Sequence, residues 1–433
     1  MEKSPTALVK YESSPESLRT ALELSSGLDG VKGSDRVLIK PNLVALDDSF
    51  PMPRYGVLTT TRLVQDMVIV LKELGVDRIT IAEGSSYGRN YGVPTEGIFE
   101  ALGYRALKDR YGVELTDLHK DPFTKTAFGD EILEVSERVL STDFLINMPV
   151  MKTHLQAVVS LGLKNLKGCI SMESRKKCHA SSESLDRYIA GYVEKLPPAL
   201  TVIDGVYGLE KGPFYYGKAV RMDVLVASRD ALSADVAGAA VMGYLPEDIP
   251  HIRMCAETRG RGADPAELNL VGERIQDVRR PLRWDNPWRT DNTGPMAWDR
   301  IGIRGVSLPK YDKTLCTGCS ALYNPILLLI MAGFRGEPFN EVEILTGKEM
   351  RPSGSAEKTL LVGNCMIKEN RSSPGIREKV LLSGCPPSME DLMDTMKVCG
   401  FHGGEEAISE FKNALVQRYK GKPEFDESFF SAS

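Results

Sequence analysis

Residues 36–44 read RVLIKPNLV, in which the apolar run 37–39 is followed by a lysine, a proline and an asparagine. A continuous apolar run with β-branched residues is typical of a strand that is buried on both faces. Proline cannot continue a central strand because it lacks the N–H group of the ladder. We therefore expect a strand that ends near Pro41 and presents Lys40 and Asn42 at its carboxyl end.

The same pattern recurs along the first half of the chain, with helical periodicity between the apolar runs. The expected strands cover 36–40, 78–82, 143–147, 200–204 and 224–228, and the expected helices cover 60–74, 95–102 and 231–241. Buried strands that alternate with helices predict an α/β fold, in which a mostly parallel sheet is covered by helices.

The chain has 433 residues, a formal charge of −5 and 42% hydrophobic residues. This composition excludes a disordered protein, a fibrous protein and a strongly basic nucleic-acid-binding protein. Arg, Gly, Pro, Asp and Asn become frequent after residue 257. We therefore expect an α/β domain at residues 1–256, a connecting segment at 257–310 and a smaller C-terminal α/β region at 311–433.

Four of the eight cysteines are patterned, although eight are few for a disulfide scaffold of this length. Cys316 and Cys319 form a C-x2-C pair, while Cys365 and Cys385 each follow a predicted strand, close to a glycine. Two such strands side by side in a parallel sheet would bring both cysteines together. The proline after Cys385 would restrict that turn, and a helix predicted at 388–398 would favour an anionic group at its N-terminus.

Four thiolates suit a [4Fe–4S] cluster or a structural zinc ion. Zinc ribbons usually present two C-x2-C pairs, whereas this set has one pair and two single cysteines. We therefore expect Cys316, Cys319, Cys365 and Cys385 to bind a [4Fe–4S] cluster, with zinc as the alternative. A further alternative is four unrelated buried thiols.

A basic and polar group of residues follows the strand predicted at 143–147. Lys152 and His154 come first, and Lys164 and Asn165 follow shortly after. Lysines can hold a carboxylate or phosphate, and histidine exchanges protons near neutral pH. We therefore predict that these four residues act catalytically on a small anionic molecule, the alternative being a solvated basic loop. The substrate-binding residues predicted at other strand ends are Lys40, Asn42, Glu83, Ser85 and Asp204.

Several segments together resemble the family known as domain of unknown function 362. They are VLIKPNLV (37–44), IAEGSS (81–86), FLINMPVMKTH (144–154), GLKNLKG (162–168), VIDGVYGLEKGP (202–213) and DVLVASRDALSADVAG (223–238). The resemblance implies an α/β fold and a link to iron–sulfur modules, which in that family are commonly ferredoxin-like. The clustered run C-x2-C-x2-C-x3-C-P is absent here, and the GCPP element at 384–387 is similar to those of other iron–sulfur proteins. A weaker likeness connects the chain to lactate racemase-type proteins.

These observations predict an iron–sulfur protein that serves electron transfer, or redox chemistry on a small anionic molecule, together with a redox partner protein. A non-redox isomerase or lyase with a structural metal and an electron-transfer scaffold are the alternatives. The longest strongly apolar run, 326–332, is too short to span a bilayer, and the N-terminus does not resemble a secretory signal. We therefore expect a cytoplasmic protein with no membrane span and no nucleic-acid partner.

Overall fold

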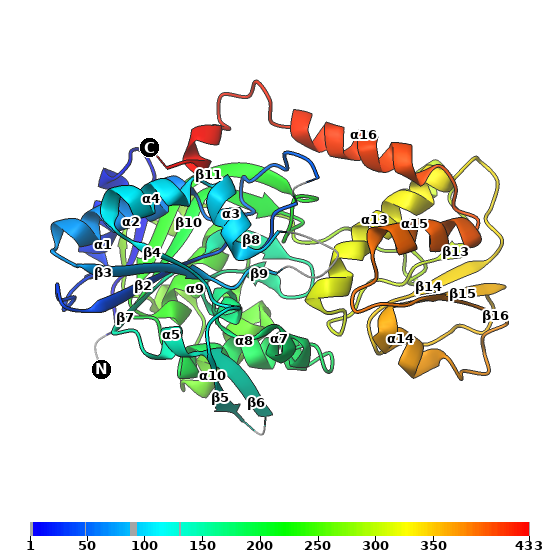
Figure 1. Cartoon of the computed structure of the whole chain (residues 1–433), viewed down its shortest axis with the longest axis horizontal. Coiled ribbons are helices and arrows are strands. Elements are labelled where there is room, and N and C mark those ends of the chain that lie inside the picture. The colour runs from blue at the N-terminus through cyan, green and yellow to red at the C-terminus, as the bar shows by residue number, and fades with distance from the viewer. Residues whose placement is uncertain (1–2, 48, 87–92, 130, 433) are drawn as a thin grey trace.

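The computed structural model describes residues 3–47, 49–86, 93–129 and 131–432, which form two main β-sheets with helices packed on them (Figure 1). The larger sheet has the order β12-β1-β11-β10-β7-β2-β3-β4, with β8 paired to β10 and β9 paired to β8. Antiparallel pairs join β11 to β1 and β10, and β9 to β8, whereas the other pairs of this sheet are parallel. Its strands are β1 (Thr6–Lys10), β2 (Arg36–Pro41), β3 (Arg78–Glu83), β4 (Glu114–Asp117), β7 (Phe144–Met148), β8 (Val150–His154), β9 (Val158–Ser160), β10 (Leu200–Glu210), β11 (Lys218–Ser228) and β12 (Leu270–Gly272). The predicted α/β fold with a mostly parallel sheet is thus confirmed.

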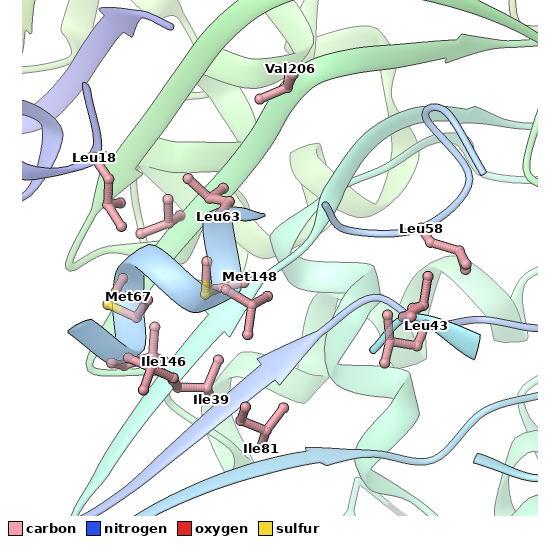
Figure 2. Packing of buried hydrophobic residues seen from close by; sticks show 14 of the residues in the cluster. Leu18, Ile39, Leu43, Leu58, Leu63, Met67, Ile81, Ile146, Met148 and Val206 are labelled. Atoms are coloured by element: carbon pink, nitrogen blue, oxygen red, sulfur yellow. The ribbon is translucent and has the colours of Figure 1, made fainter. Parts of the chain in front are cut away.

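Helices cover both faces of this sheet because its strands are apolar on both faces. In β2, Val37 and Ile39 belong to the hydrophobic cluster under α1 to α4, while Leu38 belongs to the cluster under α8 to α10. Figure 2 shows Ile39 of β2 and Ile146 of β7 packed near Met67 of α2. The helices around this sheet are α1 (Glu16–Leu24), α2 (Thr61–Glu73), α3 (Thr95–Ala101), α4 (Tyr104–Tyr111), α5 (Glu137–Leu140), α6 (Gly162–Asn165), α7 (Met172–Lys177), α8 (Ser184–Lys195), α9 (Ala231–Val241), α10 (Pro250–Thr258) and α11 (Ile275–Val278).

The smaller sheet has four parallel strands in the order β13-β14-β15-β16. Leu322 and Ile326 of α13 pack with Leu392 of α15 in one hydrophobic cluster, and Met366 of α14 packs in another. Its elements are α12 (Ala297–Ile301), β13 (Val306–Ser307), α13 (Thr317–Gly333), β14 (Val342–Leu345), β15 (Lys358–Val362), α14 (Gly363–Asn370), β16 (Glu378–Leu382) and α15 (Met389–Val398). A separate antiparallel hairpin joins β5 (Phe123–Phe128) and β6 (Glu131–Ser136).

Segment 257–310 and the C-terminal tail are divided between the two sheets, which differs from the limits expected from composition. β12 extends the larger sheet beside β1, whereas Trp298 is fully buried in the core of the smaller unit. Helix α16 (Gly404–Gln417) bridges the two units, and the chain then returns to the larger one (Figure 1). Phe430 is buried there against Tyr55. Strand pairing and burial, on which composition carries no information, decide where these residues belong.

Two strands differ from the sequence prediction in a way that shapes the site. β10 continues to Glu210 instead of ending near Asp204, because it forms a long antiparallel pair with β11. The segment after β7, for which the sequence predicted no strand, restarts as β8 directly after Pro149 and pairs with β10. Helices in the described ranges all lack the length and apolar character needed to cross a bilayer.

Candidate functional site

A cavity of about 110 Å³ lies at the carboxyl ends of β2 and β3, beside β8 and α6. We call it the basic chamber, because several lysines and an arginine line it together with one acidic side chain among the described lining residues. Its charged and imidazole-bearing lining residues are Lys40, Glu83, Lys152, His154, Lys164, Lys167, Arg175 and His179. The structure therefore brings together most residues that the sequence singled out, from four separate segments of the chain.

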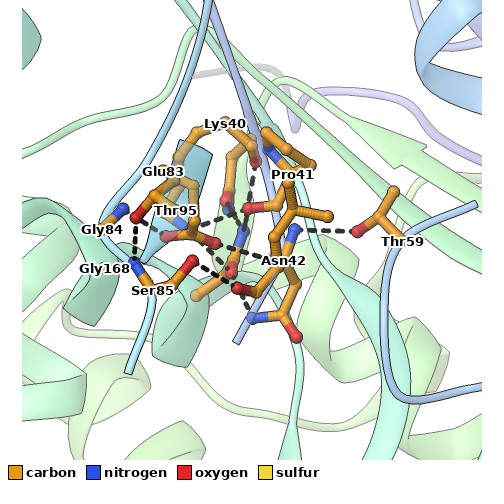
Figure 3. Close-up of polar contacts among 12 residues, drawn as sticks. Lys40, Pro41, Asn42, Thr59, Glu83, Gly84, Ser85, Thr95 and Gly168 are labelled. Carbon is orange, nitrogen blue, oxygen red and sulfur yellow. Dashed lines mark hydrogen bonds and ion pairs between the residues drawn. The ribbon is translucent and has the colours of Figure 1, made fainter. Parts of the chain in front are cut away.

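Lys40 and Glu83 form a buried ion pair that makes up one wall of the chamber (Figure 3). The Lys40 ammonium lies 2.8 Å from each carboxylate oxygen of Glu83 and also donates to Oδ1 of Asn165 at 3.1 Å. The Nδ2 group of Asn42 donates to the same Asn165 oxygen at 2.9 Å. A side chain at Gly168 would clash with Glu83 and Lys40, which explains the glycine at this close approach.

Lys152 extends from β8 into the chamber wall and is 1% exposed. Its ammonium donates to Oδ1 of Asn42 at 2.6 Å and to the carbonyl of Val57 at 2.8 Å. Burial lowers the pKa of Lys152 to about 7, with Glu83 opposing the shift and Lys40 reinforcing it. A neutral lysine amine has two N–H donors and one lone pair. The two acceptors take both donors, so the neutral form can accept a proton.

His154 is held as a neutral imidazole with a known tautomer. Its Nδ1 accepts the backbone N–H groups of Gln156 at 3.2 Å and Ala157 at 3.3 Å, so the ring proton lies on Nε2. Burial lowers the pKa of His154 well below its usual value, and the charges of Lys164 and nearby lysines lower it further. His154 therefore offers a hydrogen-bond donor to the chamber and does not become charged near neutral pH. The catalytic role that the sequence suggested for His154 stays a prediction.

Lys164 and Asn165 lie on the short helix α6, where Asp235 of α9 accepts the N–H groups of Gly162 and Leu163. Neither Lys164 nor the nearby Lys167 has an acidic partner among the described residues. Burial lowers the pKa of both lysines, and Lys167 is the largest charge contribution to the shift of Lys164. An anion in the chamber would reverse this effect by stabilising their charged forms.

Three charged or imidazole-bearing lining residues were missed as site residues by the sequence reasoning. Lys167 donates to Nε2 of His179 at 2.8 Å, and Nδ1 of the same ring donates to the carbonyl of Lys313 at 2.8 Å. Arg175 donates to the carbonyls of Gly84 and Gly168 at 2.6 and 2.9 Å. Arg175 and His179 lie on and just after α7, away from any strand end, so strand-end reasoning did not select them. Lys167 belongs to the GLKNLKG segment, and its place beside Lys164 in that segment was the signal that could have identified it.

Ser85 and Asp204 lie outside the chamber lining, unlike the other residues predicted to bind substrate. The Ser85 hydroxyl donates to the carbonyl of Leu43 at 2.7 Å and thereby holds two strand-end loops together. Asp204 accepts the N–H of Thr60 at 2.7 Å, at the start of α2, and that of Val206 at 3.0 Å. Because β10 runs past Asp204, this carboxylate lies inside the sheet, where burial raises its pKa.

The four patterned cysteines gather at the beginning of three helices of the smaller unit. Cys316 is the N-terminal cap of α13, Cys319 lies in its first turn, and Cys365 lies in the first turn of α14. Cys385 precedes α15, which begins after Ser388. β15 and β16 are parallel neighbours, and the N–H of Gly384 donates to Oδ1 of Asn364 at 2.8 Å. The loops that carry Cys365 and Cys385 therefore lie side by side.

Close backbone contacts connect the C-x2-C pair with these two loops. A Cβ atom on Gly363 would lie 3.0 Å from Sγ of Cys319, and one on Gly318 would lie 3.1 Å from Cδ of Pro386. The Cys316 thiol raises the pKa of Cys319 well above its usual value, with burial next and smaller contributions from Cys365 and Cys385. Among the described residues, no group of three or more His, Cys, Asp or Glu side chains could hold a metal ion in this arrangement.

The basic chamber and the cysteine group share a boundary. Thr317 and Ser320, which flank Gly318 and Cys319 in the first turn of α13, line the chamber. Nε2 of Gln156, a chamber residue, donates to the carbonyls of Asp312 and Leu315 at 2.8 Å. These hydrogen bonds hold the segment before Cys316 against the larger sheet. The two groups of residues, predicted separately, therefore form adjoining sites at the contact between the two units.

Fold and site together define an α/β protein with a basic chamber at its central strand ends and a smaller parallel sheet that carries four cysteines. Residues 37–240 match the domain of unknown function DUF362. The chain is 26% identical over 260 residues to Thylakoid-associated protein sll1697 of Synechocystis sp., covering 59% of this chain and 77% of that protein. It also resembles the lactate racemase apoprotein of Thermoanaerobacterium thermosaccharolyticum with 13% identity and a TM-score of 0.37, over 55% of this chain and 57% of that one. The chain thus spans less than two thirds of the racemase. The chamber's charged residues lie within the DUF362 match, and the four patterned cysteines lie outside it.

Proposed function

We propose that this protein is an iron–sulfur enzyme that carries out redox chemistry on a small anionic molecule held in the basic chamber. The boundary shared by the chamber and the cysteine group carries this proposal, because Thr317 and Ser320 line the chamber and lie in the same turn of α13 as Cys319. A ligand in the chamber would lie against the turn of α13 that holds Cys316 and Cys319.

The four cysteines fit a [4Fe–4S] cluster by their chemistry and surroundings. Three helix N-termini meet at the group, and their partial positive charges favour an anionic cluster. Gly363 leaves room beside the thiol of Cys319, because a Cβ atom at this position would lie 3.0 Å from its Sγ. When bound by four thiolates, such a cluster supplies one-electron transfer.

Zinc fits the arrangement less well. A single zinc ion needs all its thiolates within about 2.3 Å of one point. A cubane cluster binds each thiolate to a different iron, so its four thiolates can lie farther apart than those of a zinc ion. The four thiols act on one another electrostatically. One C-x2-C pair with two single cysteines, in place of the two pairs usual in zinc ribbons, supports the cluster over zinc.

In this proposal, the chamber's own residues bind and orient the anion and transfer a proton to or from it. Lys164 and Lys167 supply positive charge, and Nε2–H of His154 donates a hydrogen bond at the chamber's edge. Lys152, whose pKa is about 7, gives or takes a proton at Nζ near neutral pH. The Lys40–Glu83 pair and Asn165 form one wall of the chamber.

Iron and acid-labile sulfide analysis of anaerobically purified protein, with electron paramagnetic resonance of the reduced sample, tests the proposal. We expect four irons and four sulfides per chain and a signal that appears on reduction. Colourless protein with stoichiometric zinc would contradict it. All eight cysteines are free thiols in the structure, as a reducing compartment requires. A cytoplasmic location and a redox partner at the exposed Cys365 and Cys385 remain part of this proposal.

A non-redox isomerase or lyase is the second candidate, because the poised amine of Lys152 suits proton transfer without any redox change. The two functions differ in their need for electrons. Turnover that continues without reductant or oxidant would favour the isomerase or lyase, whereas turnover that stops without them favours the redox enzyme.

A further inference from the structure

A second cavity, of about 180 Å³, opens directly onto the basic chamber. We call it the apolar vestibule, since aromatic and aliphatic side chains dominate its lining. Among them are Leu155, Phe214, Tyr216, Tyr323 and Met389. His154, Gln156, Thr317 and Ser320 line both cavities, so the two are continuous.

The two cavities differ sharply in charge. In the chamber, Lys40 and Glu83 neutralise each other at 2.8 Å. Lys164 and Lys167 remain without an acidic partner among the described residues, and Arg175 adds a further charge. Two lysine cations are best balanced by a ligand group that carries two negative charges. Among the described residues, the vestibule lining carries one lysine, Lys211, and one acidic side chain, Asp47, so it offers such a group no comparable cluster of cations.

We infer that the natural ligand is an amphiphilic organic anion, with a doubly charged head in the basic chamber and an apolar or aromatic body in the vestibule. This inference rests on the anion binding in the proposed function and adds the substrate class. His154 lies where the two parts of the ligand meet, and its Nε2–H can donate a hydrogen bond to the head atoms nearest the apolar body.

The apolar lining of the vestibule favours a ligand with an organic body over a simple inorganic ion. A free phosphate or sulfate fills only the chamber and leaves water against the aromatic rings. An apolar body would displace that water, which is the main favourable contribution in most small-molecule sites. The vestibule also passes Pro386 and Gly318, so the body would lie beside the cysteine loops.

Isothermal titration calorimetry on the full-length, anaerobically purified protein tests this inference with five probes. Phenylphosphate and phenylmalonate carry a dianionic head and an aromatic body, phosphate carries the head alone, and benzyl alcohol carries the body alone. Phenylacetate has the body with a single charge. We expect at least one of the two dianionic aromatic probes to bind about tenfold or more tightly than phosphate, phenylacetate and benzyl alcohol. The tighter of the two identifies a phosphate or a dicarboxylate head.

Two vestibule variants show where the body lies. Phe214→Ala removes an aromatic wall on the larger unit, and Ala321→Phe, at a half-buried position on α13, fills the vestibule. Both should weaken the aromatic dianion severalfold and leave phosphate affinity unchanged, while the exposed Lys125→Met serves as control. If neither phenylphosphate nor phenylmalonate binds more tightly than phosphate and phenylacetate, the inference is overturned. Iron content is measured on the same samples. A failure of the cluster proposal can therefore be distinguished from a failure of the inferred ligand class.

Discussion

The ammonium of Lys167 lies 2.8 Å from Nε2 of His179, whose other ring nitrogen donates to the carbonyl of Lys313. This relay joins a lysine of the basic chamber to the segment that leads into Cys316. Lys313 also pairs with Asp186 of α8, and Lys348 of the smaller unit donates to the carbonyl of His179. Polar contacts of the interface therefore hold the chamber and the cysteine group in one fixed relation.

Removal of one chamber cation should weaken anion binding. Lys167→Met deletes a buried charge that has no acidic partner among the described residues, so sulfate affinity should fall roughly tenfold or more. Calorimetric titration with sulfate measures the change. Lys125→Met is the matched control, because Lys125 is exposed on β5. This variant should bind sulfate as tightly as the unsubstituted protein does. Equal losses in both variants would mean that sulfate binds nonspecifically.

Anion binding should depend on pH through Lys152. Its pKa of about 7 means that the amine gains a proton as the pH falls through neutrality, which adds a positive charge to the chamber. Sulfate affinity should therefore rise as the pH is lowered from about 8 to about 6, while sulfate keeps its own charge. The step should disappear in Lys152→Met. An unchanged step in that variant would assign the titration to another group.

The tautomer of His154 predicts which substitution the site tolerates. Glutamine offers both an oxygen to accept the backbone N–H groups and an amide N–H to the chamber, whereas leucine offers neither. His154→Gln should keep most of the sulfate affinity, and His154→Leu should lose about 1 kcal/mol of binding free energy. Similar losses in both variants would show that a charged or basic imidazole is needed.

Two cysteine variants separate cluster ligands from buried thiols. Cys385→Ser should lower bound iron and visible absorption, because it removes one proposed thiolate from the group beside α15. Cys399→Ser is the control, since Cys399 is buried in the core of the smaller unit and burial raises its pKa to about 11. Full iron content in Cys385→Ser would remove this residue from the ligand set.

The returning C-terminal tail should stabilise the larger unit. Phe430 is fully buried, with its ring centroid 5.5 Å from that of Tyr55 and 6.1 Å from that of Tyr207. Phe430→Ala should lower the free energy of unfolding by about 3 kcal/mol, because it leaves a cavity in a packed core. Urea denaturation measures this, with exposed Lys420→Ala as control. Little change in Phe430→Ala would mean that the tail only rests on the surface.

Strand-end reasoning found much of the chamber, because parallel strands bring their carboxyl ends to one edge of a sheet. Lys40 and Glu83 line the chamber for this reason. The same reasoning placed Asp204 at a strand end, but the antiparallel partner β11 extends β10 beyond it. A hairpin partner is a long-range feature, and the run of residues around Asp204 carries no sign of it.

The sequence by itself determined the α/β class and the central strands of the larger sheet, because these depend on local hydrophobic patterns. The spacing of the four cysteines is read from it directly. Only the tertiary structure decided that Thr317 and Ser320 of α13 line the chamber beside Cys316. It also brought in Arg175 and His179 and gave His154 its neutral Nε2–H form. These relations depend on burial and on contacts between distant segments, which arise only when the two units pack together.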